Sequence, residues 1–315
     1  CISAIPMRIQ DDLVDTDELR AFDAVATKRS FSIAASELGC SQSTISERIT
    51  RLEQRLQRVL VLRTTRQVKL TPDGEAALIY ARGILDIAED ARARLSRSRL
   101  AGTLRIGIED QLAATRLPPL LRMFGARFPH FGLRFVTGRN HRLQEALRMR
   151  DVDLIMTKSH PDSGAEVLWR EPLVWMARSD VAARRDGPVP VISYLGPSVL
   201  RDIVEARLAD HRRSFVTVAE CSNFIGKITL AEAGIGVVAV GRSFGNPGLI
   251  EVPEDVGLPP LGSLDFVLEA APARHSQAID AFREVLTAFT TGMAGEMPGP
   301  DQLADVIAKA ETEQP

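Results

Sequence analysis

The sequence predicts two domains: a mainly helical N-terminal domain that contains a helix-turn-helix, and a C-terminal α/β domain with two lobes. Apolar residues recur at helical spacing through roughly the first hundred residues. From Thr103 onward, short β-branched runs alternate with helical segments, as in sheets of parallel strands. A length of 315 residues, with 45% hydrophobic and 25% charged residues, suits two globular domains.

The first two helices are short and compact. The first is expected to begin at Thr16 or Asp17, either of which can cap it, and its apolar residues are Leu19, Phe22, Val25 and Ala26. The second covers about 32–38 and ends at Gly39, which tolerates the backbone geometry of a tight turn. Two adjacent small residues, Ala34 and Ala35, would let the next helix cross closely.

The third helix carries the most informative surface of the chain. Ser41 is its expected cap, and its buried stripe is Ile45, Ile49, Leu52 and Leu56. The opposite face is polar, with Gln42, Ser43, Ser46, Glu47 and Thr50, and with Arg48 and Arg51 toward its edges. Short polar groups at a helix N-terminus can reach base edges and phosphates at once. Residues 30–56 therefore predict a DNA-reading helix-turn-helix, with a generic polar helix surface as the alternative.

A β-hairpin and a long helix complete the N-terminal part. Residues 59–62 and 67–70 are β-rich and enclose the segment Arg63-Thr64-Thr65-Arg66. Pro72 suits the first turn of a helix that is expected to reach about Arg97. Its expected apolar stripe is Ala76, Ile79, Gly83, Ile87 and Leu95. The stripe could pack against its own domain or against a second subunit.

Charge is concentrated rather than abundant. The net formal charge is −2, yet residues 41–71 contain six arginines and one lysine, namely Arg48, Arg51, Arg55, Arg58, Arg63, Arg66 and Lys69, against Glu47 and Glu53. A local cationic surplus of this kind attracts phosphate backbones. Charge-rich helices are also common solvated surfaces, so this signal alone is weak.

Other classes of protein are disfavoured by what the sequence contains. No run reaches the ~18 apolar residues of a transmembrane helix. The five histidines are scattered without metal-ligand spacing, so no metal is expected. Gly234-Ile235-Gly236 is only a fragment of a dinucleotide fingerprint and precedes a strand instead of following one, so no cofactor is expected. Cys1, Cys40 and Cys221 are odd in number and far apart, which favours a reducing cytoplasm.

The C-terminal domain is predicted from its strands. The expected strands lie at 104–108, 133–136, 152–156, 189–192, 214–218 and 236–240. Their alternation with helices predicts parallel sheets that are covered on both faces. Ligands of such folds bind beyond the carboxyl ends of the strands.

The sequence closely resembles the LysR-type transcriptional regulators. The resemblance rests on Leu19-Arg20-Ala21-Phe22, Ser30-Phe31-Ser32-Ile33-Ala34-Ala35, Ser41-Gln42-Ser43-Thr44-Ile45-Ser46, Arg51-Leu52-Glu53, and Arg63 through Gly74, and it continues to about residue 290 in looser form. It implies a mostly α winged helix-turn-helix domain plus an α/β two-lobed effector-binding domain similar to periplasmic binding proteins. The implied DNA contacts are Ser32, Gln42, Ser43, Thr44, Ser46, Arg48 and Arg51, with Arg63, Thr65 and Arg66 on the wing. Ser43 departs from the usual Pro, which puts the family's average base preference in doubt.

The resemblance also implies where an effector would bind. The implied effector-binding residues are Glu109, Asp110, Gln111, Arg139, Asn140, Ser198, Cys221 and Ser222. Two acids at the first of these turns would repel an anion, which favours a neutral or cationic effector, unless they only cap a helix. Cys221 is either a redox switch or, because no second thiol lies nearby, a small packing residue.

The expected domain limits follow from these elements: 1–12 a disordered leader, 13–72 the winged helix-turn-helix, 73–99 a linker and dimerisation helix, 103–290 the effector-binding domain and 291–315 a tail. Within the effector-binding domain, lobe 1 would comprise about 103–165 and 267–290, and lobe 2 about 166–266. Trp175 and the segment 257–261 also resemble a motility-regulator branch of the family, typified by LrhA and HexA.

The expected function is sequence-specific regulation of transcription in the cytoplasm, without enzymatic activity. The expected partners are double-stranded DNA with a palindromic operator, a second copy of the chain in a homodimer or homotetramer, and an unknown small-molecule effector, but no membrane. RNA polymerase is a further candidate. Two alternatives stay open: a constitutive DNA-binding protein whose α/β part only oligomerises, and an enzyme with an appended DNA-binding module.

Overall fold

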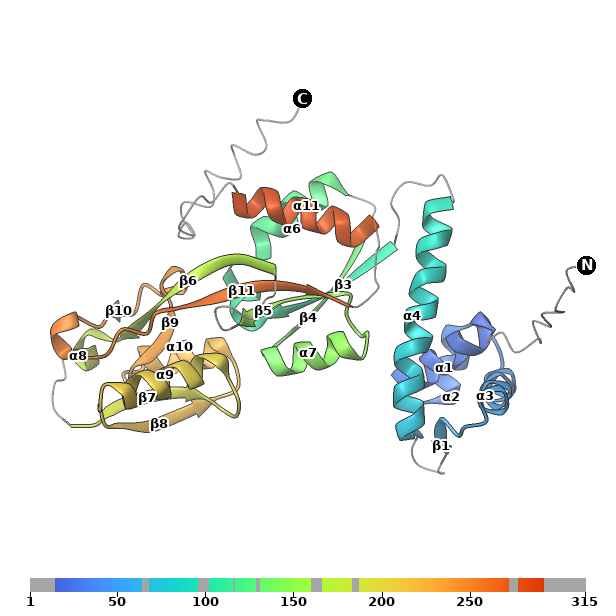
Figure 1. The fold of residues 1–315 in the computed structure, drawn as a ribbon, viewed down its shortest axis with the longest axis horizontal. Coiled ribbons are helices and arrows are strands. Elements are labelled where there is room, and N and C mark those ends of the chain that lie inside the picture. The colour runs from blue at the N-terminus through green and yellow to red at the C-terminus, as the bar shows by residue number, and fades with distance from the viewer. Residues whose placement is uncertain are drawn as a thin grey trace, which may run out of the picture. The chain divides into compact units, whose positions relative to one another are not determined.

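The computed structural model describes residues 15–63, 68–95, 102–115, 117–128, 131–159, 166–182, 187–271 and 277–291. The expected leader, wing residues Thr65 and Arg66, and the tail beyond Thr291 lie outside these ranges. The chain divides into two compact units, which meet at Ser98/Arg99 in the sequence. Figure 1 shows the elements of both.

The first unit is built on helix α1 (Thr16–Lys28). Its N-cap is Asp15, whose carboxylate accepts a hydrogen bond from the Asp17 amide at 2.8 Å. The expectation of a cap at Thr16 or Asp17 was therefore wrong, because Asp15 satisfies the first free amide from one position earlier. Phe22 and Val25 are fully buried, as their spacing predicted.

Helices α2 (Phe31–Glu37) and α3 (Gln42–Leu56) form the helix-turn-helix. Ser30 caps α2, and Ser41 caps α3 as predicted, by accepting from the Thr44 amide. Gly39 in the turn has a φ of +63°, which an L side chain rarely adopts. The predicted stripe on α3 is confirmed at Ile45, Ile49 and Leu52, all fully buried; Leu56 is 40% exposed, because the helix ends there.

Strands β1 (Val61–Arg63) and β2 (Val68–Leu70) pair antiparallel and confirm the hairpin, although β1 begins later than expected. Helix α4 (Pro72–Leu95) follows directly. A Cβ on Gly74 would lie 2.1 Å from the Leu60 carbonyl oxygen, so only glycine lets the hairpin approach the first turn of α4 this closely.

Helix α4 leaves part of its predicted apolar stripe exposed in the single chain. The side chains that α4 buries in its own unit are Leu78, Ala81 and Arg82, while Ile87 of the predicted stripe is 61% exposed. Arg82 donates to the Asp23 carboxylate of α1 at 2.7 Å, which anchors the helix. The helix is apolar on more than one side, so periodicity alone does not show which side its own domain covers.

The second unit contains a seven-stranded mixed sheet. Along its main path the order is β10 (Ile250–Glu251), β6 (Glu166–Ala177), β11 (Ser263–Ala270), β5 (Leu154–Ser159), β3 (Gly102–Glu109) and β4 (Phe131–Gly138), and β9 (Val238–Gly241) pairs with β6. Strands β3, β4 and β5 are parallel, but β11 runs antiparallel to both β5 and β6. The expectation of purely parallel sheets was therefore wrong.

Helices cover both faces of the sheet where β3 to β5 lie (Figure 1). On one face are α6 (Leu117–Arg127) and α11 (Gln277–Thr291), and on the other is α7 (Asn140–Arg148). The short helix α5 (Asp110–Thr115) follows β3 directly. Phe124 of α6 and Phe282 of α11 are fully buried, with ring centroids 5.6 Å apart, so the two helices share one core.

The second lobe contains a parallel pair of strands, β7 (Val189–Tyr194) and β8 (Phe215–Cys221). The same lobe contains α8 (Ser179–Ala182), α9 (Val199–Asp210), α10 (Phe224–Glu232) and the 3₁₀ turns η1 (Arg242–Phe244) and η2 (Glu254–Val256).

Strands β6 and β11 connect the two lobes. The first part of β6 pairs with β11, and its last part pairs with β9 and β10 of the second lobe. The pairing of β6 with β11 shifts register between Phe266 and Val267, where Trp169 stacks on Phe266 at 4.5 Å. No helix among the described residues is long and apolar enough to span a membrane.

Candidate functional site

The outer surface of α3 presents the polar residues that the sequence predicted for DNA contact. Gln42 and Ser43 are exposed, and Ser32 of α2 donates to Gln42 Oε1 at 3.1 Å. The hydroxyls of Ser43 and Thr44 lie 2.7 and 2.8 Å from Ser41 Oγ. The start of the helix thus carries two hydrogen-bonded groups, the Ser32–Gln42 pair and the hydroxyls of Ser41, Ser43 and Thr44.

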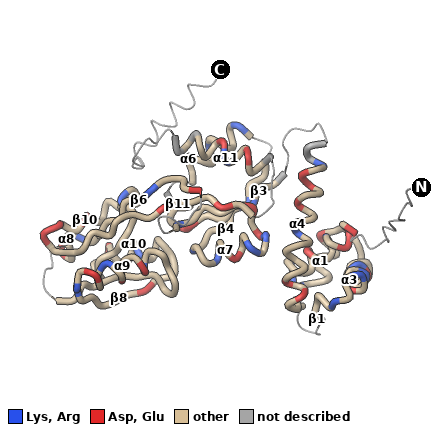
Figure 2. Tube along the Cα trace, viewed as in Figure 1, with Lys and Arg blue, Asp and Glu red and all other residues tan. Residues whose placement is uncertain are grey.

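The arginines of α3 are partly neutralised by acids of α1. Arg48 forms an ion pair with Asp17 at 3.2 Å. Arg51 and Arg55 lie 3.6 and 3.4 Å from the buried carboxylate of Glu18. Figure 2 shows Lys and Arg gathered on α3. These pairs hold α3 against α1, and the exposed guanidinium faces of Arg48 and Arg51 still border the polar surface.

Glu53 has a role that the sequence analysis missed. Its carboxylate accepts from the amides of Leu60 and Val61 at 2.8 and 3.1 Å, which fixes the entry into the hairpin. The spacing of an acid seven residues before a β-rich run gave no recognisable signal. Of the predicted wing residues, only the backbone of Arg63 lies within the described part of the chain.

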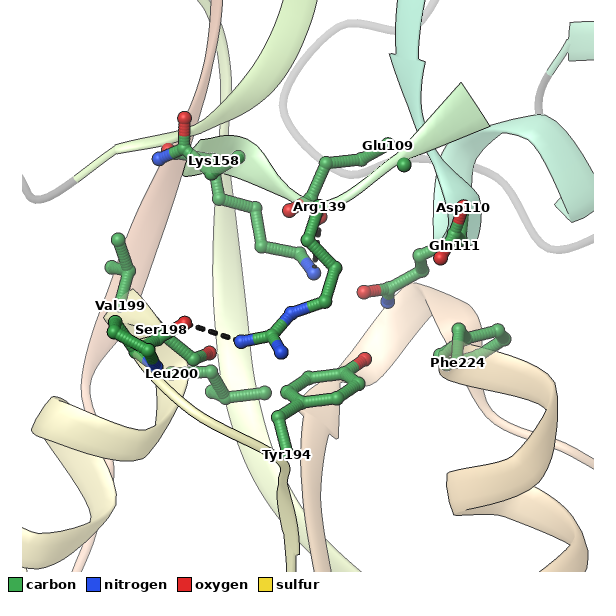
Figure 3. Close-up of a pocket in the computed structure, with 13 residues that line it drawn as sticks. Glu109, Asp110, Gln111, Arg139, Lys158, Tyr194, Ser198, Val199, Leu200 and Phe224 are labelled. Atoms are coloured by element: carbon green, nitrogen blue, oxygen red, sulfur yellow. Dashed lines mark hydrogen bonds and ion pairs between the residues drawn. The ribbon is translucent and has the colours of Figure 1, made fainter. Parts of the chain in front are cut away.

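The second site is a cleft between the lobes of the second unit, drawn in Figure 3. Predicted residues in its lining are Glu109, Asp110, Gln111, Arg139, Asn140 and Ser198; further lining residues are Gly138, Lys158, Tyr194, Pro197, Val199, Leu200 and Phe224. Cys221 and Ser222 do not line it. Most of these residues follow or end the parallel strands β3, β4, β5 and β7, where an α/β fold places its ligands.

A buried ion pair lies at the centre of the cleft. Lys158 Nζ is 2.5 Å from Glu109 Oε2, and the two side chains are 7% and 9% exposed. Asn140 donates to the Lys158 carbonyl at 2.9 Å and so fixes the end of β5. Lys158 balances the charge of Glu109, so the acids at this turn do not together repel an anion. The inference of a neutral or cationic effector therefore loses that support.

Tyr194 is surrounded by cationic groups. The side-chain nitrogens of Lys227 and Lys158 lie 4.6 and 5.8 Å from its ring centroid, and Arg139 Cζ lies 5.2 Å from it. Burial raises the pKa of the Tyr194 phenol well above its usual range, so the ring stays neutral. Cations are attracted to such a ring face.

Lys227 is a buried lysine behind this ring. Its ammonium donates to the Ala239 carbonyl at 2.7 Å. Burial, reinforced by the charge of Lys158, lowers the pKa of Lys227 to about 7. Nothing in the sequence indicated that Lys227 is buried, because a lysine on a helix is most often solvated.

Arg139 bridges the two lobes. It precedes α7 in the first lobe, and its guanidinium donates to the carbonyls of Leu195 and Pro197 in the second. Asp110 begins α5 on another wall of the cleft. Burial and, secondarily, the charge of Glu109 raise the pKa of Asp110. The cleft therefore combines acidic and basic side chains at partly desolvated positions.

Cys221 lies at the end of β8, where its Sγ is 3.6 Å from the Ser193 carbonyl and 3.5 Å from that of Asn223. Burial raises the pKa of the Cys221 thiol, so little reactive thiolate forms at neutral pH. This geometry favours the packing interpretation over the redox switch.

A helix-turn-helix with a hairpin, joined to a two-lobed α/β unit, defines a DNA-binding regulator with a separate ligand domain. Residues 16–75 match the bacterial regulatory helix-turn-helix of the lysR family, and residues 97–290 match the LysR substrate binding domain. The chain belongs to the LysR family and is a helix-turn-helix transcriptional regulator with an effector-binding domain.

Individual relatives agree with this assignment. The transcriptional regulator DgdR of Burkholderia cepacia is 35% identical over 279 residues, which cover 87% of this chain and 94% of DgdR. PecT of Dickeya dadantii is 28% identical over 305 residues, covering 93% and 96% of the two chains.

Solved structures share the fold. ArgP from Mycobacterium tuberculosis superposes with a TM-score of 0.69 at 19% identity, over 90% of this chain and 98% of ArgP. Full-length CbnR in complex with its target DNA superposes with a TM-score of 0.56 at 18% identity, over 86% and 98%.

Proposed function

We propose that this regulator binds a palindromic operator as a homodimer or homotetramer, and that a small molecule in the cleft changes how it binds. The observation that carries the proposal is the cleft itself, whose charged walls belong to two lobes bridged by Arg139. A ligand that contacts both lobes changes their relative arrangement only if it binds one arrangement better than the other.

DNA reading is assigned to the exposed start of α3. Gln42, Ser43 and Ser46 would face base edges, and Arg48 and Arg51 would contact phosphates. The solved CbnR structure contains its target DNA, which supports this use of the shared fold. Arg63, Thr65 and Arg66 are proposed as wing contacts on the basis of their sequence positions.

Self-association is proposed through α4. Tyr80, Ile84 and Ile87 lie on one face of this helix and are 74%, 43% and 61% exposed in the single chain. Burying such side chains is favourable, by about 25 cal/mol per Å² of apolar surface. A second copy that pairs with this face would place two recognition helices on one palindrome.

Sedimentation analysis tests the self-association. Ile87→Glu is expected to shift the protein toward monomer at a given concentration, because a charge would be buried in the pair of helices. Ile33→Glu is the control, since Ile33 is 55% exposed on α2 of the same unit. An unchanged oligomeric state in Ile87→Glu would contradict this interface.

The effector proposal is tested by melting the protein against a metabolite library and by footprinting the operator with and without each binder. A saturating ligand at ~100-fold excess over Kd stabilises by about 2.7 kcal/mol, which a melting curve detects. If no ligand shifts the melting curve, the protein is better described as a constitutive DNA-binding protein. If a ligand binds and neither footprint nor transcription changes, the coupling mechanism is wrong.

Four further proposals concern the partner, the compartment, the activity and the branch of the family. RNA polymerase is a proposed partner and the cytoplasm the proposed compartment, since the family acts on transcription. We assign the chain no enzymatic activity. Membership of the LrhA/HexA-like branch is supported only by Trp175, whose indole N–H donates to the Pro259 carbonyl at 2.8 Å and so joins the two segments of that resemblance.

A further inference from the structure

The charges of the cleft are not fully balanced by one another. Glu109 and Lys158 neutralise each other at 2.5 Å. Arg139 contacts two backbone carbonyls. Within the described part of the chain, Arg139 forms no ion pair with a carboxylate, and Asp110 forms none with a cation. An ionised group at a desolvated position is costly without a partner of opposite charge.

The unbalanced charges lie on different sides of the cleft. In Figure 3, Arg139 extends between Lys158 and Tyr194 toward Ser198, whereas Asp110 and Gln111 lie on the opposite side near Phe224. A guanidinium has five N–H groups, and its bonds to Leu195 and Pro197 use only some of them. The remaining N–H groups can hold a ligand carboxylate.

The start of α9 adds to the anion-binding side. This helix has twelve residues, and its N-cap Ser198 makes no side-chain capping bond. Val199 and Leu200 of its first turn line the cleft next to Arg139. Free amides at a helix N-terminus favour negative charge.

We propose that the effector of this cleft is a small zwitterion of the α-amino acid type, whose carboxylate binds Arg139 and the first turn of α9 while its ammonium binds Asp110. This inference rests on the proposed function, in which the cleft holds the effector. A simple anion would leave Asp110 unpaired, and a simple amine would leave Arg139 unpaired. Because burial raises the pKa of Asp110, an ammonium beside it restores the charged form of the carboxyl.

Ligand series test the proposal on the full-length protein. The twenty proteinogenic amino acids are titrated by calorimetry, followed by the decarboxylated amine and the deaminated acid of the tightest binder. For L-alanine these are ethylamine and propionate, and for L-phenylalanine they are phenethylamine and 3-phenylpropionate. We expect the amino acid to bind at least tenfold more tightly than either analogue, because each analogue lacks one charge-assisted contact.

Two variants assign the charges to residues. Asp110→Asn is expected to weaken binding of the amino acid at least tenfold. Binding of the deaminated acid should stay unchanged or become tighter. Arg139→Gln is expected to weaken binding of the amino acid and of the deaminated acid but not binding of the amine. Asp210→Asn, at the exposed end of α9, is the control and should change none of the three. The melting temperature of each free variant verifies folding.

The outcomes separate this inference from the proposed function. If the deaminated acid or the amine binds as tightly as the amino acid, the proposal of a zwitterionic effector is wrong. If no amino acid binds but another metabolite shifts both melting and footprint, the inference is overturned and the proposed function stands. If no metabolite has any effect, the proposed function fails too. Equal losses for all three ligands in a folded Asp110→Asn would also overturn the assignment.

Discussion

The two units of this regulator treat ionised side chains in opposite ways. On the recognition helix, Arg48 and Arg51 are partly exposed to solvent and form ion pairs with acids of α1. In the cleft, Glu109 and Lys158 are almost completely buried and depend on each other, while Arg139 relies on backbone carbonyls. The charged groups of a phosphate-binding surface stay hydrated until DNA binds. The charged groups of a ligand cleft are partly desolvated, so every unpaired charge there costs free energy.

The largest expected effect comes from breaking the buried pair. Glu109→Gln leaves Lys158 charged and buried, and removal of one partner from such a pair costs about 3–5 kcal/mol. The measurement is urea unfolding followed by tryptophan fluorescence, since both tryptophans, Trp169 and Trp175, lie in the effector-binding unit.

The double variant Glu109→Gln with Lys158→Met is the control for that experiment. It removes both charges, so much of the lost stability should return. A double variant that is as unstable as the single one would show that shape, rather than charge, sets the cost.

The next effect is a pH dependence caused by Lys227. Its pKa is lowered from 10.5 to about 7 by burial, so between pH 7 and 9 the unfolded chain binds more protons at this site than the folded one. Stability contributed by this site therefore rises with pH. Relative to Lys227→Met, the wild type should gain about 1.4 kcal/mol of unfolding free energy per pH unit in that window. Groups present in both proteins largely cancel, and parallel pH profiles would refute the shift.

A smaller effect is expected at the DNA surface. Gln42→Ala should weaken operator binding by about 1–3 kcal/mol and leave binding to random DNA nearly unchanged. Competition binding at fixed salt measures both. Equal losses on the two DNAs would mean that Gln42 does not read bases. Ser32→Ala, which removes the hydrogen bond to Gln42 Oε1, should reproduce part of the loss.

The smallest effect belongs to the exposed pair of Asp17 and Arg48. Asp17→Asn should lower stability by less than about 1 kcal/mol, since such pairs are screened by water and salt. The same change frees Arg48 and should slightly strengthen non-specific DNA binding at low salt. A loss as large as that of Glu109→Gln would remove the contrast between the two units.

The helix-turn-helix could be predicted because its signals are local. Ser41, Gly39 and the buried stripe of α3 lie within a few turns of one another, and each has one physical role. The cleft could be predicted only in part. The rule that ligands bind beyond strand ends led to Glu109 and Arg139 after β3 and β4. The same rule, applied to β5 and β7, would have indicated Lys158 and Tyr194.

Other features had no readable signal. Lys227 is buried because α10 packs on β7 and β8, a contact between distant segments. Strands β6 and β11 were not among the expected strands, and periodicity does not show which way a neighbouring strand runs, so the antiparallel part of the sheet was missed. In α4, apolar residues on several sides left the phase of the buried face open.

The two strands that connect the lobes determine which motions are available between them. Strand β6 pairs with β11 from Glu166 to Pro172, so lengthening the connection would require the loss of several backbone hydrogen bonds. Only at Ser263 and Leu264, before β11 begins to pair with β5, do the two strands form a two-stranded segment, and twisting such a segment costs much less. Rearrangement of the lobes is therefore expected to be a rotation about the axis of this segment. Trp169, stacked on Phe266 close to this segment, would report the rotation as a change in its fluorescence.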